Sequence, residues 1–478
     1  SGFAAMGMEI LWFRHLTILL GGFRSVFSLL LTVILLGIGA GSLLSGLLYR
    51  GRERSAQWLM VVQGLFVVST LLGLALGDAT AILQAVVGDP AYQAAVGSAG
   101  DAAGAAASGA PRMFAELWFN AKPILADVAL PALMMGFSFP LANALVQRTE
   151  DAVGRRAGVL YLSNTAGAVG GSLVAGFLLL PAFGIQGSAT ILVTVAGLTS
   201  VPLYLLGTRR PTRVFTGSMV ATLGAVGLWL MLPSDYVIAR ALARSGESER
   251  RLSMREGVTE VIEVTEIPGL GRRLLTNGHS MSATTRLSQR YMRALVHIPL
   301  LTLDRPETVL VIGFGVGNST HAATLHPSVR RVEVADLSKD ILASASYFSD
   351  ANGDVLHDPR VAVYVNDGRQ HLQMQPPGSY DLVTLEPPPI GYAGVSALYS
   401  TEFYALARTR LRPKGYVSQW LPAYQVPEAT TLAMIRAFID VFPHAVLVSG
   451  AEADLVLLCT NDSQIDIDPA RLSAALSS

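Results

Sequence analysis

The stretch 308–325, "TVLVIGFGVGNSTHAATL", decides the fold of the C-terminal half of the chain. Thr308–Ile312 is a short, continuous apolar run with a β-branched bias, which is typical of a buried parallel strand. Three alternating glycines follow: Gly313, Gly315 and Gly317. Glycine lets the backbone turn sharply and approach a ligand closely, and Asn318 or Ser319 can then cap a helix. A strand, a glycine loop and a helix in this order predict a nucleotide-binding α/β unit.

Carboxylates stand at the ends of the next three predicted strands. The strands are "RRVEVADL" (330–337), "VAVYVNDG" (361–368) and "YDLVTLE" (380–386), and their acids are Asp336, Asp367 and Glu386. Asp336 lies 23 residues after Gly313, a distance at which an acid can accept hydrogen bonds from ribose hydroxyls. An ordinary helix cap is the other interpretation of Asp336. Because open α/β sheets bind ligands at the carboxyl ends of their strands, these features together predict a nucleoside pocket.

Glu386 leads directly into three prolines, Pro387–Pro389. Proline fixes φ and restricts the residue before it, so the loop is expected to be stiff and to fix the direction of the carboxylate. Such a carboxylate can take a proton from an attacking amine and hold the amine in line. A solvent-exposed carboxylate or a structural ion pair is the alternative. In the following segment, 390–404, Tyr392 and Tyr399 are candidate lids over the pocket.

Composition narrows the classes of partner and site. The chain has 478 residues, too many for one ordinary domain. Its 35 basic and 35 acidic residues balance, which argues against a nucleic-acid partner. Cys459 is the single cysteine, so the chain has no internal disulfide and no multi-cysteine metal site. His321 and His326 are five residues apart, a poor spacing for two ligands on one helix face, so we expect no metal.

Residues 1–232 contain long apolar runs. Hydrophobic residues make up 51% of the chain and the mean hydropathy is +0.45, which is high for a soluble protein. A transmembrane helix needs ~20 mainly apolar residues. Seven runs approach this length: 2–20, 26–48, 58–76, 124–145, 159–180, 188–206 and 214–232. So many runs argue against buried helices of a soluble protein and against a cleaved signal peptide. We predict a membrane domain of about seven spans.

Charged residues give conflicting signals about orientation. Basic residues cluster in alternate loops, at 49–54, 147–156 and 208–213, and the positive-inside rule places these loops in the cytoplasm. A count of seven spans then leaves the C-terminal domain outside. Five arginines after the last span instead favour the inside: Arg240, Arg244, Arg250, Arg251 and Arg255.

Ionisable and small residues also occur within the apolar runs. Four ionisable residues lie in or near them: Glu9, Arg14, Lys122 and Asp127. Intramembrane charges are costly and often mark a site or an internal pair, although the long side chains of Arg14 and Lys122 can also reach the interface. The GxxxG pairs at 37–41 and 167–171 predict close packing of helices.

The soluble half resembles the spermidine synthase (polyamine aminopropyltransferase) family. Four stretches carry the resemblance: "VLVIGFGVGN" (309–318), "DPRVAVYVNDGRQHL" (358–372), "YDLVTLEPPP" (380–389) and "STEFYALARTRLRPKGYVSQWL" (400–421). Upstream, "GRRLLTNGHSMSAT" (271–284) is similar to the family's small N-terminal β-subdomain, and "YMRALVHIPLL" (291–301) to its entry helix. The apolar half resembles that of bacterial proteins which fuse a transporter-like helical bundle to such a domain.

The resemblance implies the fold class, and the change in composition near 233–255 separates the two halves. We expect a multi-span α-helical membrane domain at 1–232 and a linker at 233–254. A small β-subdomain with its entry helix follows at 255–300, and a soluble α/β Rossmann-like, class I methyltransferase-like domain at 301–478.

The resemblance also implies a reaction and a nucleoside site. Members of the family transfer an aminopropyl group from decarboxylated S-adenosylmethionine to an amine and release methylthioadenosine. Asp336 would then bind the ribose hydroxyls, and Asp367 the adenine amino group, with Gly368 leaving room for the base. The Gly313–Gly317 loop would line the thioether side. S-adenosylmethionine itself is the alternative co-substrate.

On the amine side, Glu386 matches the family's acidic catalytic residue, Tyr291 a tyrosine beside the amine, and Gln419 a polar residue of the pocket wall. Several positions depart from the family pattern. Val316 replaces an aspartate that holds the aminopropyl amine, the loop after Glu386 lacks a second acid, and Met281 and Met292 replace glutamines. Burial of a diamine without counter-charges would cost several kcal/mol, so we expect an acceptor less charged than putrescine, such as a lipid-associated amine.

Three functions fit these observations. The first is a membrane-bound transferase with a small amine or a lipid-associated acceptor. The second is a transporter or sensor whose degenerate domain binds a nucleoside or a polyamine without catalysis, and the third is a partner-binding module. We expect a multi-pass protein of the bacterial inner membrane whose soluble domain is cytoplasmic, where the nucleoside co-substrate is made. The oligomeric state is left open, a homo-oligomer included.

Overall fold

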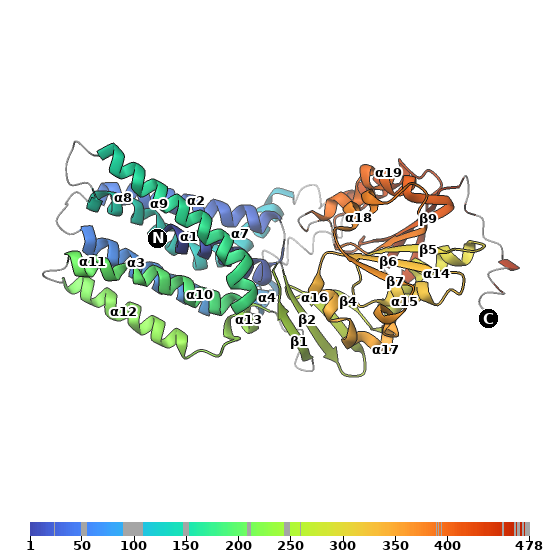
Figure 1. The fold of residues 1–478 in the computed structure, drawn as a ribbon, viewed down its shortest axis with the longest axis horizontal. Coiled ribbons are helices and arrows are strands. Elements are labelled where there is room, and N and C mark those ends of the chain that lie inside the picture. The colour runs from blue at the N-terminus through green and yellow to red at the C-terminus, as the bar shows by residue number, and fades with distance from the viewer. Residues whose placement is uncertain are drawn as a thin grey trace. The chain divides into compact units, whose positions relative to one another are not determined.

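The computed structural model describes most of the chain (Figure 1). The described residues are 1–22, 24–48, 55–88, 109–146, 153–207, 212–242, 249–258, 260–388, 390, 392, 394–451, 454–462, 465, 469–470 and 473. The basic segments 49–54, 147–152 and 208–211, Arg244 and Pro389 lie outside the described residues. The chain divides into two compact units, one of residues 1–245 with 256–261 and the other of residues 246–255 with 262–478.

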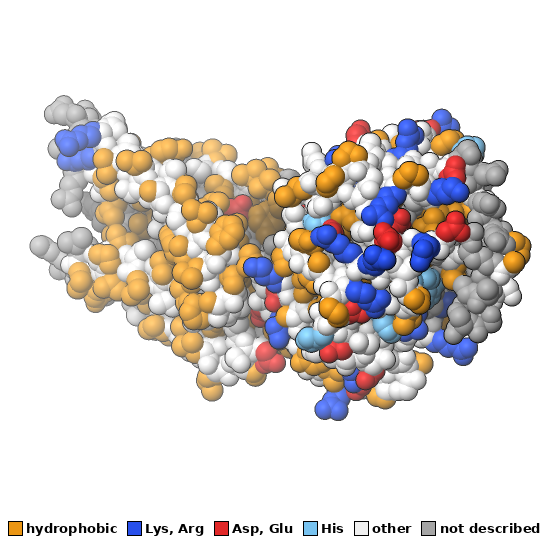
Figure 2. Space-filling view, turned by 45° about the vertical axis from the view of Figure 1, so that its right-hand side comes forward, with side chains coloured by type: hydrophobic (Ala, Val, Ile, Leu, Met, Phe, Trp, Pro, Cys, Tyr) orange, Lys and Arg blue, Asp and Glu red, His pale blue; other side chains and the backbone are white. Residues whose placement is uncertain are grey.

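The N-terminal unit is helical. Its described elements are α1 (Gly2–Leu20), α2 (Arg24–Leu48), α3 (Ser55–Leu76), α4 (Ala79–Gly88), α7 (Gly109–Ile124), η2 (Leu125–Ala129), α8 (Leu130–Val146), α9 (Val153–Val174), η4 (Ala175–Leu179), α10 (Leu180–Leu198), α11 (Ser200–Gly207), α12 (Arg213–Leu230) and α13 (Tyr236–Ala241). Six helical stretches among the described residues are long and apolar enough to cross a membrane. Much of the visible surface of this unit is hydrophobic, whereas charged side chains of both signs dot the other unit (Figure 2).

One of the six stretches, Gly154–Leu205, contains two of the spans predicted from the sequence. Its 52 residues would extend about 78 Å as one straight helix, more than twice the ~30 Å hydrocarbon core of a bilayer. Gly184 interrupts the helix with φ 63° and ψ −171°. This break separates the predicted spans 159–180 and 188–206, so six helical stretches accommodate the seven predicted runs.

The predicted GxxxG pairs lie where helices touch. A Cβ atom on Gly41 of α2 would lie 2.1 Å from the carbonyl oxygen of Leu133 in α8. One on Gly171 of α9 would lie 2.1 Å from the carbonyl oxygen of Phe3 in α1. Only glycine allows backbones to approach this closely, which confirms the predicted packing role.

A four-stranded sheet opens the C-terminal half. Its strands are β1 (Arg250–Glu256), β2 (Val261–Ile267), β3 (Gly271–Thr276) and β4 (His279–Ala283), in this order. β3 pairs antiparallel with both β2 and β4. Helix α14 (Arg286–Thr302) follows, and the Thr285 hydroxyl caps it by accepting from the Ser288 amide. These elements are of the kind and in the order expected of the small β-subdomain and entry helix, and β1 begins at Arg250, within the segment 233–254 that was expected to be a linker.

A seven-stranded sheet forms the core of the C-terminal unit. Its strands are β5 (Thr308–Ile312), β6 (Arg331–Asp336), β7 (Val361–Val365), β8 (Tyr380–Leu385), β9 (Leu411–Leu421), β10 (Val446–Ala451) and β11 (Asp454–Thr460). Their spatial order is β10-β11-β9-β8-β5-β6-β7. The strands from β9 to β7 are parallel, and β11 is antiparallel to both β9 and β10. The chain runs outward from β5 to β7 and returns at β8, so the topological switch point lies between β5 and β8.

Helices cover both faces of this sheet (Figure 1). The helical elements are α15 (Asn318–Thr324), α16 (Lys339–Ala343), η5 (Ala345–Phe348), α17 (Ser349–Asn352), η6 (Val355–His357), α18 (Gly368–Met374), η7 (Val395–Tyr399), α19 (Thr401–Arg410) and α20 (Glu428–Ile439). The residues of β5 show why both faces are covered. Leu310 and Ile312 pack in a hydrophobic core with α18 and α19. Val309 and Val311 pack in another core with α14 and α15. Alternate residues of a strand face opposite sides, so a continuous apolar run forms a strand buried on both faces. The predicted α/β fold is confirmed.

Candidate active site

The glycine loop joins β5 to α15 at the switch point. Gly313, Gly315 and Gly317 all have positive φ, at 86°, 55° and 86°. A Cβ on Gly317 would lie 2.7 Å from the Phe314 ring, and one on Gly315 2.8 Å from the Ser282 hydroxyl, so both space and backbone conformation require glycine. Gly317 is the residue that precedes α15.

The predicted cap of α15, Asn318 or Ser319, is therefore wrong. A left-handed glycine already turns the chain into the helix, and the helix begins at Asn318. The side-chain amide of Asn318 does not cap the helix. It donates a hydrogen bond to the Ala283 carbonyl of β4 at 3.2 Å. This bond ties the glycine loop to the small sheet.

Asp336, at the end of β6, holds the glycine loop. One carboxylate oxygen accepts from the Phe314 amide at 2.7 Å and the other from the Ser338 amide at 2.8 Å. Burial raises the pKa of Asp336, and the two backbone hydrogen bonds oppose this. Each carboxylate oxygen can accept a second hydrogen bond, so Asp336 retains capacity for ribose hydroxyls. That role stays a prediction.

Asp367 and Gly368 stand at the start of α18. Asp367 is exposed and caps the helix by accepting from the Gln370 amide at 2.8 Å. A Cβ on Gly368 would lie 2.2 Å from the Ile312 side chain, so packing against β5 already requires glycine there. These contacts give both residues structural roles, and their roles toward adenine stay predictions.

Glu386 and Tyr291 are brought together by β8 and α14. The Tyr291 hydroxyl donates a hydrogen bond to a Glu386 carboxylate oxygen. Burial raises the pKa of Glu386 to about 8, the bond from Tyr291 opposes this, and the charge of Asp454 adds to it. Burial and Glu386 raise the pKa of Tyr291 far above its ordinary value, so Tyr291 remains a hydrogen-bond donor. Such a carboxyl is suited to exchange protons near neutral pH.

A second carboxylate, Asp454, lies within electrostatic reach of this pair. The Trp420 indole N–H donates to Asp454 at 3.0 Å, and the Trp420 ring stacks on Tyr291 with centroids 6.4 Å apart. The charge of Asp454 raises the pKa of both Glu386 and Tyr291. The site thus has two carboxylates, each held by one ring of a stacked aromatic pair.

Sequence reasoning missed Asp454 because it examined only the carboxyl ends of predicted strands. β11 is antiparallel to β9, so its first residue, Asp454, lies at the edge where the parallel strands end. A carboxylate at the start of a final antiparallel strand is therefore the signal that could have revealed it.

Two of the residues that depart from the family pattern lie beside Tyr291 and Trp420. Val316 and Met292 are fully buried in one hydrophobic cluster with Tyr291 and Trp420. The Asn318 amide and the Ser282 hydroxyl contact the Met292 sulfur at 3.2 Å and 3.7 Å. Met281 of β4 is half-buried. The surroundings of Tyr291 are therefore largely apolar on this side.

Tyr392 lies in the segment that follows Glu386, and Gln419 contacts that segment from β9. Gln419 of β9 is fully buried, and its amide donates to the Leu398 carbonyl in η7 at 3.2 Å. This hydrogen bond holds the segment that follows Glu386 against β9. The Tyr392 ring meets the His279 ring of β4 edge to face, with centroids 6.3 Å apart. The roles of Gln419 in the pocket wall and of Tyr392 as a lid stay predictions.

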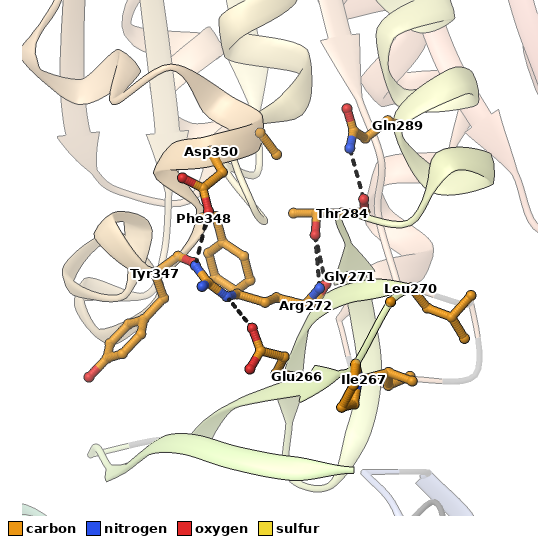
Figure 3. Close-up of a pocket in the computed structure, with 13 residues that line it drawn as sticks. Glu266, Ile267, Leu270, Gly271, Arg272, Thr284, Gln289, Tyr347, Phe348 and Asp350 are labelled. Carbon is orange, nitrogen blue, oxygen red and sulfur yellow. Dashed lines mark hydrogen bonds and ion pairs between the residues drawn. The ribbon is translucent and has the colours of Figure 1, made fainter. Parts of the chain in front are cut away.

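A cavity of about 340 Å³ lies elsewhere in the C-terminal half, between the β2–β3 turn and residues 347–351 (Figure 3). Arg272 crosses it, pairs with Glu266 at 3.2 Å and Asp350 at 3.6 Å, and donates to the Tyr347 carbonyl at 2.5 Å. None of the predicted site residues lines this cavity. The contacts of Arg272 therefore link the small sheet to residues 347–350 of the core.

Comparison with known proteins finds one matching domain family and several similar proteins. Residues 288–444 match the spermine/spermidine synthase domain family. The chain is 30% identical over 312 residues to polyamine aminopropyltransferase 2 of Streptomyces coelicolor, a match that covers 63% of this chain and 55% of the relative. It is 29% identical over 359 residues to the polyamine aminopropyltransferase of Mycobacterium tuberculosis, covering 73% and 68%.

Some likenesses are partial. The match to the Streptomyces relative and that to a Corynebacterium efficiens polyamine aminopropyltransferase span only 55% and 62% of those proteins. Among solved structures, the spermidine synthase of Thermotoga maritima is 19% identical, has a TM-score of 0.41, and covers 46% of this chain and 77% of its own.

Proposed function

Because the chain carries a spermine/spermidine synthase domain and is homologous to polyamine aminopropyltransferases, we propose that its C-terminal unit transfers an aminopropyl group to an amine acceptor. The donor is decarboxylated S-adenosylmethionine, the co-substrate of that family, and the second product is methylthioadenosine. Asp336, Asp367, Gly368 and the glycine loop hold the nucleoside at the switch point of the sheet.

The observation that carries the proposal is the pair of carboxylates on stacked aromatic rings. Tyr291 donates to Glu386, Trp420 donates to Asp454, and the two rings stack. An ammonium group is attracted both by carboxylates and by the faces of aromatic rings. Asp454 thus supplies a second negative charge that the loop after Glu386 lacks.

The surrounding residues favour a particular class of acceptor. Val316 and Met292 give the site an apolar wall beside Tyr291. A second ammonium group placed against this wall would lose its hydration without a partner. The acceptor is therefore an amine with one cationic head at Glu386 and Asp454 and an apolar stem on the side of Met292.

Glu386 acts as the base in this scheme. The acceptor enters as an ammonium ion, which must lose a proton before its nitrogen can attack the carbon next to the sulfonium. The ionised Glu386 takes that proton, the new C–N bond forms, and the C–S bond breaks to leave a neutral thioether. The nearby acceptor cation itself favours the ionised form of Glu386.

We also propose that the helical unit anchors the enzyme in the inner membrane of a bacterium, with the catalytic unit in the cytoplasm. Six described helical stretches have the length and composition of spans. Arg240, Arg250, Arg251 and Arg255 follow the last span and favour the cytoplasmic side. A membrane location suits an acceptor with an apolar stem.

The proposal is tested with the full chain in detergent. The protein is incubated with decarboxylated S-adenosylmethionine, or with S-adenosylmethionine, and with amines of one or two charges and increasing alkyl length. Methylthioadenosine is measured by chromatography. We expect release only with the decarboxylated donor, and faster release with alkyl monoamines than with putrescine. No release with any amine would overturn the proposal.

The second candidate function is binding without catalysis. The burial of Val316 in an apolar cluster favours it, because the family places an aspartate there for the donor's amine. Calorimetric binding of methylthioadenosine or of a polyamine without turnover on any amine would support this sensor and exclude the transferase.

A further inference from the structure

A buried pair of ionisable side chains lies inside the helical unit, and aminopropyl transfer does not use it. His15 of α1 has an exposed fraction of 0% and Asp127 of η2 one of 5%. The His15 Nε2 and Asp127 Oδ2 atoms are 3.6 Å apart, beyond a hydrogen bond. Among the described residues, neither His15 ring nitrogen nor Asp127 Oδ2 has a hydrogen-bond partner. Ionisable groups within apolar helices are costly and are retained mainly at functional sites.

A π-helical turn and two glycines lie next to this pair. Asp127 lies in the π-helical turn η2, between α7 and α8, and such turns are rare and frequent at functional sites. A Cβ atom on Gly73 of α3 would lie 3.0 Å from the Asp127 Cα, and one on Gly77 would lie 2.7 Å from His15 Nε2. A larger residue at either position would collide with the pair, so the two glycines make room for His15 and Asp127.

Further polar side chains follow along α3. Gln63 and Thr70 are seven residues apart, so they lie on one side of the helix about 10 Å from each other, and Gly77 directly follows the end of the helix at Leu76. Thr70 is fully buried, and its hydroxyl has no hydrogen-bond partner among the described residues. The Gln63 amide donates to the Ser138 hydroxyl of α8 at 3.4 Å. We call His15, Asp127, Thr70, Gln63 and Ser138 the polar file.

One end of the polar file approaches solvent. Asp78 directly follows Gly77 and forms an ion pair with Arg240 of α13 at 3.0 Å, with side chains 27% and 37% exposed. Among the residues of α1 and α7 whose side chains the structure describes, the other charged groups are Glu9, Arg14 and Lys122. The Arg14 side chain donates to the Gly257 carbonyl at 3.0 Å.

We propose that the helical unit relays protons along the polar file, with His15 and Asp127 as the exchanging pair. A proton from water near Asp78 binds the His15 imidazole and passes to the Asp127 carboxylate. Water molecules that enter the helical unit then carry it past Thr70 and Gln63, because each transfer needs a hydrogen-bond distance, and only N–H and O–H bonds form and break. One carboxylate and one imidazole are too few ligands for a metal cation, whereas they suffice for a proton. The relay rests on the proposed membrane location and is separate from aminopropyl transfer.

The experiment uses the full chain in liposomes that contain a pH-sensitive dye. A potassium gradient with valinomycin drives protons inward, and the rate of lumenal acidification is measured. We expect wild-type vesicles to acidify faster than protein-free vesicles, and Asp127→Asn to reduce the protein-dependent rate at least tenfold. Ser188→Ala, which removes a buried hydroxyl of α10 outside the polar file, should leave the rate unchanged.

Further variants separate a relay from a structural role. Each variant must elute from size-exclusion chromatography like the wild type and must release methylthioadenosine at the wild-type rate. If Asp127→Asn fails this check, His15→Gln replaces it, with the same tenfold loss expected. Asp127→Glu should retain at least half of the proton flux. Wild-type vesicles no faster than empty ones, or a well-folded Asp127→Asn or His15→Gln at the wild-type rate, would overturn the proposal.

Discussion

At the scale of single residues, two neighbours shift the pKa of Glu386 in opposite directions. Tyr291 donates to the carboxylate and so favours its ionised form, whereas the charge of Asp454 disfavours it. The base works only when ionised, so the rate should rise with pH through the pKa of about 8. The hydrogen bond from Tyr291 therefore helps a buried carboxyl to ionise and so to act as a base.

The first prediction concerns the pH profile of kcat/KM. Tyr291→Phe removes the hydrogen bond, raises the pKa of Glu386 and moves the rising limb to higher pH. Asp454→Asn removes a like charge, lowers that pKa and moves the limb to lower pH. Each shift should be about one unit. Glu428→Gln, which neutralises an exposed carboxylate at the start of α20, is the control and should not move the limb. Shifts in the same direction for both variants would contradict the assignment.

Asp454 should also bind the acceptor. Asp454→Asn removes a counter-charge of the ammonium group, so the KM for the amine should rise about tenfold, equivalent to ~1.4 kcal/mol, with little change in kcat. Steady-state rates at a pH above both rising limbs separate this effect from the pH shift. An unchanged KM would remove Asp454 from the acceptor site.

Asp336 has a different task, toward the nucleoside. Asp336→Asn keeps the size of the side chain but loses an acceptor for the Phe314 amide and for ribose. Calorimetry should show methylthioadenosine bound at least tenfold more weakly, about 1.4 kcal/mol. Glu428→Gln, which neutralises an exposed carboxylate outside the predicted nucleoside site, serves as the comparison and should bind methylthioadenosine like the wild type. Wild-type affinity for Asp336→Asn would contradict the predicted ribose site.

At the scale of elements, the glycine loop should tolerate substitution unequally. Gly313 and Gly317 both have φ 86°, but a Cβ meets no atom within 4 Å at Gly313 and the Phe314 ring at 2.7 Å at Gly317. Gly313→Ala should therefore cost only backbone strain, about 1–2 kcal/mol, and Gly317→Ala more, because of the added clash. Thermal unfolding of the full chain measures both. An equal loss of stability in the two variants would contradict this account.

The elements also show what the sequence could predict. The strand before the glycine loop and the acids at three strand ends follow from local patterns, whereas the small β-subdomain follows from the family resemblance, and the structure has them all. Asp454 and the Tyr291–Trp420 stack depend on how distant segments pair, because β11 joins β9 only in the folded sheet. The cap of α15 was missed since a left-handed glycine replaced a side-chain cap. Local periodicity contains no information on such pairings.

At the scale of the whole molecule, the helical unit should hold the chain in a membrane. Alkaline carbonate should leave the full chain in the pellet of isolated membranes, whereas a mild detergent should release it, because the apolar helices need lipid or detergent around them. In inverted vesicles, added protease should cleave the catalytic unit without detergent if that unit is cytoplasmic. Release by carbonate, or protection in inverted vesicles, would contradict the proposed location.

Glu386→Gln tests the central claim most directly. Methylthioadenosine release from decarboxylated S-adenosylmethionine is compared between wild type and Glu386→Gln with the best amine. Calorimetry first establishes that both bind methylthioadenosine equally. Loss of a general base should lower kcat by about a hundredfold or more. A variant that binds the nucleoside normally and turns over at the wild-type rate would contradict the account.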